Sequence, residues 1–416
     1  MKIIIVVTNY LDRTVISSKR WRCISKQLVK LGNEIDILAF DEGYIQEDDT
    51  QNNLGDIFYH SLSKKKEKPH NIVHTPRYNQ KHVFNPILFL YYLLEEIYTK
   101  YRCKKIVKKI LSDELLHYNQ YDYVLCSVQN IDTFYIAKEL LQYKKAKKLV
   151  CDIRDYLTGL IYGRPELDFL GKKQIIEISK FASFILTVNE GIADWIRKKT
   201  NNAVNVYVFP HGIDSIEDYV EIFNQKSDKK LVITWTGTSY PNLRIIEPIF
   251  SAIKGIGADN IKFIVAGKNT EEFEQCATKY HVENVLDNRK WLEREEAIRI
   301  QRQADILFYP TFVDEDKAYC GLSGKFPEYI NSGKWVLCIV NAPKGYTWLK
   351  DEFNRLGIGL VCDGKSTEVV NEIMNFLLKI LHGKIAKCEI NSETKKKYRI
   401  EDISLAINDL LILNKE

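Results

Sequence analysis

The stretch "KLVITWTG" at residues 230–237 decides the fold, because it begins a strand–glycine–helix pattern for the second time in the chain. Its apolar run predicts a buried strand, Gly237 predicts the loop that ends it, and residues 242–256 predict the next helix. Further strands are predicted at 261–267, 303–311, 334–340 and 357–362, and helices at 366–382 and 401–413. Apolar runs without alternation are typical of parallel strands that helices cover on both faces.

The first half of the chain has the same organisation. "KIIIVVT" at 2–8 predicts a buried strand, and residues 17–32 predict a helix that ends at Gly32. The remaining predicted strands are 34–40, 121–128, 147–153, 181–188 and 205–212, and the helices are 86–116, 131–142, 170–180 and 190–199. The pattern stops near residue 212 and restarts near 230, so we predict two doubly wound, Rossmann-like α/β domains that face each other across a cleft.

The predicted domains are residues 1–212 and 230–400, with a polar linker at 213–229 and a C-terminal helix at 401–416. A length of 416 residues also favours two domains over one, and 45% hydrophobic residues indicate a globular chain. The net charge of +5 is far from that of a nucleic-acid-binding protein, so no nucleic-acid partner is expected.

The cysteines and the apolar segments predict a cytoplasmic protein. None of the nine cysteines forms a C-x-x-C pattern, which argues against a structural zinc site. The first strand is too short for a signal sequence, and the apolar run at 86–98 is too short to cross a bilayer. Its continuation, "YTKYRCKKIVKKI", is basic and amphipathic. That pattern predicts either peripheral contact with the inner face of the membrane or an ordinary solvated helix.

Ligands of doubly wound sheets bind beyond the carboxyl ends of the strands. There the chain has "GTSYPNLR", "GKNT" and "TFVDEDKAYCGLSGKFPEY", after the strands 230–237, 261–267 and 303–311. Their glycines would let backbone N–H groups approach a phosphate, and Arg244, Lys268 and Lys325 would neutralise it. These residues predict a ligand with a diphosphate, although a glycine after a strand is also common for purely architectural reasons.

The order of these motifs resembles that of GT-B fold glycosyltransferases, specifically glycosyltransferase family 4, over most of the chain. In the first half the resemblance rests on "SKRWRCISKQLVKLGNEIDIL", "DIRDYL", "LTVNEGIADWI" and "VFPHGID". In the second half it rests on "WTGTSYPNLR", "FIVAG" and "ADILFYPT…GKFPEYINSGKWVL". The resemblance implies retaining transfer of a sugar from a UDP- or GDP-linked donor to a glycan or polyprenyl-linked acceptor, in surface polysaccharide assembly. It implies no cofactor beyond the donor.

The resemblance also implies roles for single residues on the donor side. The family has two glutamates separated by seven residues: Glu328 matches the second, which binds ribose, whereas Cys320 stands at the first, which contacts the sugar. Arg244 takes the place of the lysine in the family's diphosphate-binding Arg–Lys pair, and Thr238, directly after Gly237, takes the place of the arginine. The other implied donor contacts are Lys325 of a K-x-x-E-Y pattern, amides of Gly321, Leu322 and Ser323, and Trp291 against the base.

Departure of a nucleoside diphosphate builds negative charge, which fixed cations and amides stabilise without a protein nucleophile. We therefore expect Arg244 and Lys325 to act in catalysis. We expect transfer without a metal, because no Asp-x-Asp motif follows a strand and "DED" at 314–316 suits a solvated loop.

On the acceptor side, Asp155 is expected to position a hydroxyl, with Asn9, Arg154 and His211 nearby. Structural alternatives remain open: Asp155 as a helix cap, Arg154 and Asp155 as an ion pair, and His211 as part of a turn.

Two other functions remain open. A nucleotide-sugar epimerase would have the same two doubly wound halves, although Cys320 in place of a glutamate disfavours it. A catalytically silent, nucleotide-binding subunit would suit the two departures from the family pattern, Cys320 and Thr238.

Overall fold

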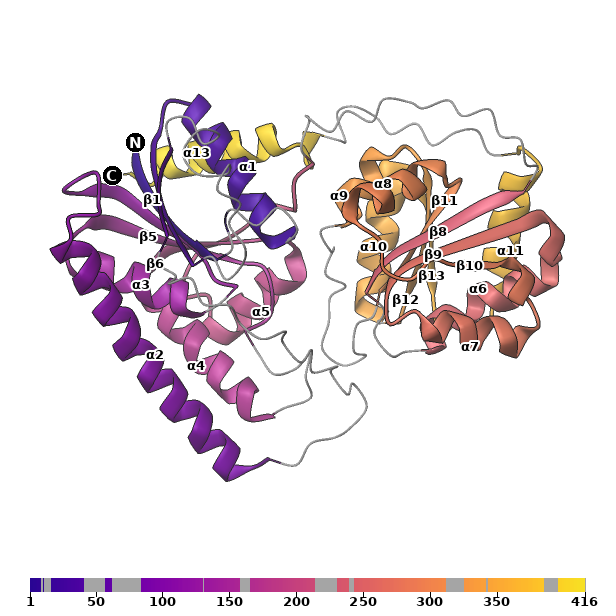
Figure 1. Cartoon of the computed structure of the whole chain (residues 1–416), viewed down its shortest axis with the longest axis horizontal. Coiled ribbons are helices and arrows are strands. Elements are labelled where there is room, and N and C mark those ends of the chain that lie inside the picture. Colours follow the sequence, from indigo (N-terminus) through magenta and orange to yellow (C-terminus); the bar gives the residue numbers. More distant parts are fainter. Residues whose placement is uncertain are drawn as a thin grey trace. The chain divides into compact units, whose positions relative to one another are not determined.

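The computed structural model divides the chain into two compact units (Figure 1). Unit 1 comprises Met1–Asp214 and Tyr398–Glu416, and unit 2 comprises Ser215–Lys397. The residues that the structure describes are 1–8, 10, 16–40, 57–61, 84–129, 131–157, 165–213, 230–238, 243–311, 325–341, 343–384 and 396–415.

Unit 1 is built on a seven-stranded parallel sheet with the order β3-β2-β1-β4-β5-β6-β7. The strands are β1 (Lys2–Thr8), β2 (Glu34–Phe40), β3 (Ile57–Ser61), β4 (Tyr121–Ser127), β5 (Ala146–Ile153), β6 (Ala182–Thr187) and β7 (Val206–Val208). The helices are α1 (Ile16–Lys30), α2 (Pro86–Ser112), α3 (Ile131–Gln142), α4 (Pro165–Phe181), α5 (Glu190–Thr200) and α13 (Ile400–Leu413).

Apolar side chains on both faces of β1 explain why helices cover this sheet on two sides. Ile4 and Val6 pack into the core formed with α2, α3, α4 and α5. Ile3 and Ile5 point the other way, into the core formed with α1 and α13. The C-terminal helix, predicted as a separate segment, is therefore part of unit 1.

Unit 2 repeats the architecture with a six-stranded parallel sheet of order β10-β9-β8-β11-β12-β13. Its strands are β8 (Leu231–Thr238), β9 (Ile261–Lys268), β10 (Leu286–Asn288), β11 (Ile306–Thr311), β12 (Trp335–Val340) and β13 (Gly359–Asp363). Its helices are α6 (Leu243–Ile256), α7 (Glu271–Tyr280), α8 (Arg294–Gln303), α9 (Lys325–Asn331), α10 (Pro343–Leu356) and α11 (Val369–Leu381). One face of the sheet shares a core with α6, α7 and α11.

The prediction of two doubly wound α/β domains is confirmed. The elements missing from the prediction, β3, β10, α7, α8 and α10, are short or rich in polar residues. The predicted strand 205–212 shortens to β7, and the long helix ends at Ser112, where the next N–H, of Asp113, bonds the Lys109 carbonyl. None of the described helices is both long enough and apolar enough to cross a lipid bilayer.

Candidate functional site

The strand order of unit 2 reverses direction between β8 and β11, which lie side by side. In doubly wound sheets the carboxyl edge at such a reversal is the usual ligand site. Strand β8 ends there with Gly237 and Thr238, and its neighbour β9 ends with Gly267 and Lys268.

The two strand-end glycines allow a very close approach of backbone and side chain. Gly237 has a φ of 145°, and a Cβ atom built on it would lie 1.7 Å from Nζ of Lys325. Gly267 has a φ of 149°, and its Cβ would lie 1.6 Å from the carbonyl oxygen of Gly237. Both conformations favour glycine. Besides the expected approach of amides to a phosphate, Gly237 thus makes room for the side chain of Lys325, and Gly267 makes room for the backbone of β8.

Lys325 begins α9 and places its ammonium group on the end of β8. Nζ donates a 2.6 Å hydrogen bond to the carbonyl of Thr236 and lies 5.4 Å from the centre of the Trp235 ring. Burial of the ammonium lowers the pKa of Lys325 to about 8, against an opposing effect of Glu328. Among the described residues, no carboxylate lies within ion-pair distance of this ammonium, so an anionic ligand could supply its counter-charge.

Two further contacts, which the sequence did not predict, stabilise this edge of the unit 2 sheet. Gln301 of α8 is buried and donates a 2.7 Å hydrogen bond to Oγ1 of Thr236, whose carbonyl accepts from Lys325. Arg294, the first residue of α8, donates a 2.7 Å bond to Oε1 of Glu328 in an ion pair. No sequence motif marks either residue, because α8 itself was not predicted.

The other predicted donor-side residues are placed as follows. Thr238 and Lys268 are exposed at the strand ends, and Trp291 is exposed after β10. Arg244 lies in the first turn of α6, but its side chain is outside the described residues, as are Cys320, Gly321, Leu322 and Ser323. Within the described part of the chain, no three His, Cys, Asp or Glu side chains gather as a metal-ligand set; the acidic loop at 314–316 lies outside it.

Unit 1 carries a different charged cluster at the carboxyl end of β5. Asp152 is fully buried, and its Oδ2 accepts a 2.8 Å hydrogen bond from Nε1 of Trp21. The same oxygen lies 3.4 Å from Nε of Arg20 and 3.6 Å from Nε of Arg154. Arg20 also donates to the carbonyls of Phe209 and Pro210, at 3.1 and 2.7 Å. The cluster therefore joins α1, β5 and the segment that follows β7.

The predicted acceptor-side residues surround this cluster in part. His211 directly follows Pro210, and burial together with Arg20 and Arg154 lowers its pKa well below the usual value, so the imidazole is neutral at pH 7. Desolvation raises the pKa of Asp155, while Arg154 opposes the shift. Arg154 forms its ion pair with Asp152, and helix α4 begins at Pro165, well beyond Asp155. Asn9 lies outside the described residues.

The comparison with known proteins rests on solved structures, because no family model and no curated protein sequence matches the chain. The galactosyltransferase WaaB of the lipopolysaccharide outer core matches with a TM-score of 0.62 and 13% identity, over 100% of both chains. HepE of Anabaena, solved with UDP-glucose, matches with a TM-score of 0.60 and 13% identity, over 99% of this chain and 100% of the other. The chain has the GT-B fold of these glycosyltransferases.

An enzyme described as a UDP-N-acetylglucosamine 2-epimerase, from Listeria monocytogenes, also matches. Its TM-score is 0.58 and its identity 13%, over 98% of this chain and 94% of the other. The fold alone therefore does not separate transfer from epimerisation, and function has to be argued from the residues.

Proposed function

We propose that the protein is a retaining glycosyltransferase of glycosyltransferase family 4. It moves a hexose from a UDP- or GDP-linked donor to a glycan or polyprenyl-linked acceptor, in bacterial surface polysaccharide assembly at the cytoplasmic face of the membrane. The observation that carries the proposal is the Lys325 ammonium at the strand-order reversal of unit 2, held by a carbonyl and without a carboxylate partner among the described residues. HepE, which shares the fold, was solved with UDP and with UDP-glucose.

The donor would lie along the carboxyl edge of β8 and β9. Lys325 contacts its diphosphate, Lys268 and Arg244 add positive charge, and Glu328 holds the ribose. The hydrogen bond that Arg294 donates uses Oε1 of Glu328, which leaves Oε2 to accept from a ribose hydroxyl. The loop amides of Gly321, Leu322 and Ser323 complete the diphosphate contacts, and Trp291 packs against the base.

The reaction breaks the bond between the anomeric carbon and the β-phosphate oxygen. Negative charge gathers on the departing diphosphate, where Lys325 and the other cations stabilise it, so no metal is required. The acceptor hydroxyl attacks the same face of the sugar, and the departing phosphate takes its proton. We assign the positioning of that hydroxyl to Asp155, and Asn9, Arg154 and His211 are the other residues assigned to the acceptor.

A donor screen tests the proposal. Purified protein should bind UDP or GDP in calorimetry and slowly hydrolyse at least one nucleotide sugar, with or without excess chelator. Added membrane extracts that contain lipid-linked acceptors should convert hydrolysis into transfer with retained anomeric configuration. Release of an epimerised sugar without acceptor would instead identify an epimerase. Nucleotide binding without turnover of any donor would identify a silent subunit.

A further inference from the structure

Helix α2 of unit 1 exposes an apolar stripe along the face opposite its buried side. Its exposed members recur every three or four residues, so they share one side of the helix: Ile87, Leu90, Tyr91, Leu94, Ile97, Tyr98 and Tyr101. Ile87 is 81% exposed and Ile97 is 64% exposed. The opposite side of α2, with Cys103, Val107 and Ile110, packs into the core of unit 1. Core packing therefore does not explain the stripe.

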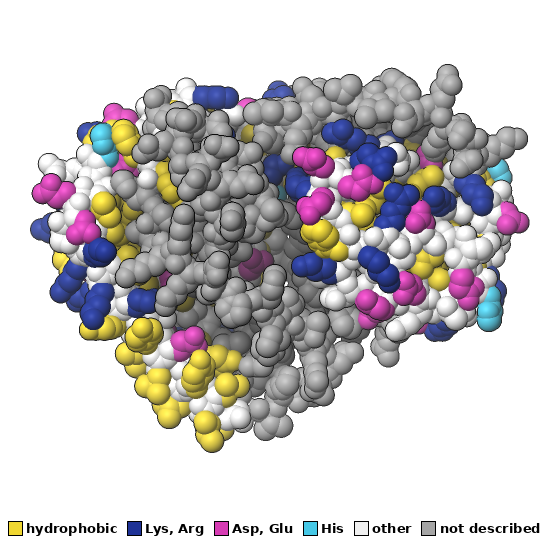
Figure 2. Space-filling view, viewed as in Figure 1, with side chains coloured by type: hydrophobic (Ala, Val, Ile, Leu, Met, Phe, Trp, Pro, Cys, Tyr) yellow, Lys and Arg dark blue, Asp and Glu magenta, His cyan; other side chains and the backbone are white. Residues whose placement is uncertain are grey.

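Two further aromatic side chains contact Phe89, which lies on the side of α2 that faces α4 and not on the stripe. Phe169 of α4 is exposed and meets Phe89 edge to face, with ring centres 5.3 Å apart. Phe84 is exposed, and the centre of its ring lies 5.4 Å from the centre of the Phe89 ring. Figure 2 shows hydrophobic side chains gathered over the lower end of α2, with Lys and Arg side chains toward its other end. A contiguous exposed apolar surface of this kind marks an interaction site.

The same face of α2 becomes cationic where the apolar stripe ends. Continuing the spacing of three or four residues from Tyr101 leads to Lys104, Lys105 and Lys108, which are all exposed. Nζ of Lys105 lies 4.5 Å from the centre of the Tyr101 ring. Within the described helix α2, Glu95 is the only exposed acidic side chain.

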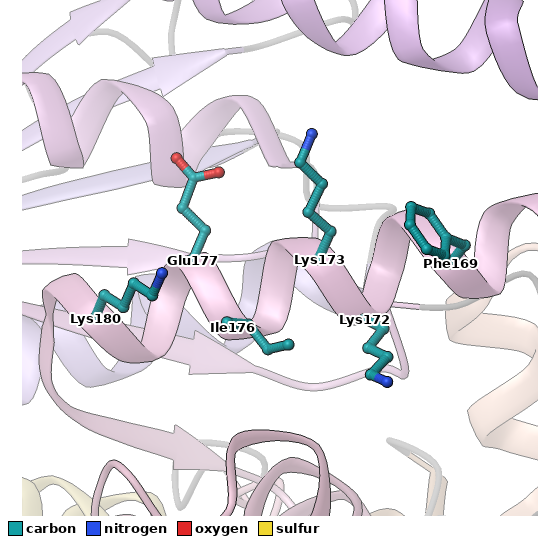
Figure 3. A pocket seen from close by; sticks show the side chains of 6 residues that line it. All are labelled: Phe169, Lys172, Lys173, Ile176, Glu177 and Lys180. Atoms are coloured by element: carbon teal, nitrogen blue, oxygen red, sulfur yellow. The ribbon is translucent and has the colours of Figure 1, made fainter.

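Helix α4 also carries cations, but it lies against the side of α2 opposite the stripe. A shallow groove of about 380 Å³ along α4 is lined by Phe169, Lys172, Lys173, Ile176, Glu177 and Lys180. Figure 3 shows that Lys173 and Glu177 leave the helix on one side, and Lys172 and Ile176 on another, so these side chains do not converge on one small ligand. Glu177 is engaged by Lys100 and Lys138. The groove is therefore not part of the face that carries the stripe.

We propose that this face of α2, formed by the apolar stripe and by Lys104, Lys105 and Lys108, docks on a lipid bilayer that carries anionic headgroups. Apolar and tyrosine side chains enter the boundary between headgroups and acyl chains, while the lysines remain at the level of the phosphates. A second copy of the chain fits less well, because pairing two such faces would set lysines against lysines or against apolar side chains. The inference does not depend on the proposed function.

The test is co-sedimentation of the full chain with vesicles of phosphatidylcholine, with and without phosphatidylglycerol. We expect binding to the anionic vesicles, and about a hundredfold weaker binding for the double variant Leu90→Glu, Leu94→Glu. The double variant Lys105→Gln, Lys108→Gln should weaken binding to anionic vesicles by roughly fivefold per lysine, with little change on neutral vesicles.

The matched control is Leu405→Glu, Leu413→Glu, which adds the same charges at exposed apolar positions of α13 and should leave vesicle binding unchanged. Thermal unfolding shows whether each variant is folded, and its affinity for UDP or GDP separates loss of docking from loss of the nucleotide site. Absence of wild-type binding to both kinds of vesicle would overturn the proposal. So would a wild-type dimer that the Leu90, Leu94 variant splits into monomers.

Discussion

Cations lie at the carboxyl edges of both sheets, but they have different partners. In unit 1, Arg20 and Arg154 lie against the fully buried carboxylate of Asp152. In unit 2, Lys325 bonds a backbone carbonyl, and among the described residues no carboxylate reaches it. A cation with a fixed carboxylate holds structural elements together. A cation whose counter-charge is missing has a lowered pKa and favours an anion from solution.

The largest effect should come from breaking the unit 1 cluster. Asp152→Asn leaves Arg20 and Arg154 buried without their carboxylate, and we expect the free energy of unfolding to fall by about 3–5 kcal/mol. Chemical denaturation measures it. Glu190→Gln, which removes one partner of an exposed ion pair with Arg197, should cost less than about 1 kcal/mol. If Asp152→Asn instead leaves stability intact but removes acceptor binding, the cluster belongs to the acceptor site.

Lys325 should show the reverse behaviour, with a large effect on binding and little on stability. Lys325→Met removes the charge and its hydrogen bond to phosphate, which should weaken UDP or GDP binding by roughly a hundredfold, or up to about 3 kcal/mol. The free energy of unfolding should stay the same or rise, because the variant no longer contains a desolvated charge. Lys254→Met removes an exposed lysine from the same unit and should alter neither the nucleotide affinity nor the free energy of unfolding. If Lys325→Met lowers the free energy of unfolding but leaves nucleotide affinity unchanged, Lys325 has a structural role instead.

Substitution of Glu328 tests whether this residue binds ribose although it forms an ion pair with Arg294. Glu328→Ala should weaken nucleotide binding by roughly tenfold, because a hydrogen bond to a charged group contributes about 1.5 kcal/mol or more. Arg294→Met should have a smaller effect if Arg294 only orients the carboxylate. Calorimetry of both single variants and of the double variant gives the coupling free energy between Glu328 and Arg294 in nucleotide binding. Equal affinity of wild type and Glu328→Ala for every nucleoside diphosphate would make the ion pair purely structural.

A substitution at Gly237 would move the ammonium group of Lys325 instead of removing it, which refines the comparison between the two edges. In Gly237→Ala, the new Cβ would displace Nζ of Lys325, so we expect about fivefold weaker nucleotide binding, or about 1 kcal/mol. Gly257→Ala is the matched control: its φ is also positive, at 100°, but its Cβ meets nothing within 4 Å. Both should lose about 1 kcal/mol or more of stability to backbone strain. Equal nucleotide affinity in the two variants would show that the position of Nζ is not critical.

The sequence predicts the architecture better than the site, and the reason is separation along the chain. Buried parallel strands such as β1 and β8 are visible because each is a local apolar run. The contact between Lys325 and Thr236 joins residues 89 positions apart, and that between Trp21 and Asp152 joins residues 131 apart. No local pattern encodes either contact. The family resemblance assigns Glu328 to the ribose, but its partner Arg294 lies on a helix that the sequence pattern does not reveal.

The smallest effect is a pH dependence that links Lys325 to its missing counter-charge. In the free protein its pKa is about 8, whereas the ordinary value is 10.5. A diphosphate binds the charged lysine, so nucleotide affinity should fall by about fourfold between about pH 7 and pH 8.5 as the lysine loses its proton. Calorimetry across this range measures the fall, and Lys325→Met should flatten it.

Stability should change in the opposite direction. Between about pH 8 and pH 10.5 the unfolded chain binds more protons at this lysine than the folded chain does, so this lysine's contribution to the free energy of unfolding rises with pH. Lys325→Met should remove that contribution as well. A nucleotide affinity that stays constant from pH 7 to pH 9 in the wild type would mean that Lys325 does not face the phosphates. The comparison between the two edges would then reduce to two structural clusters.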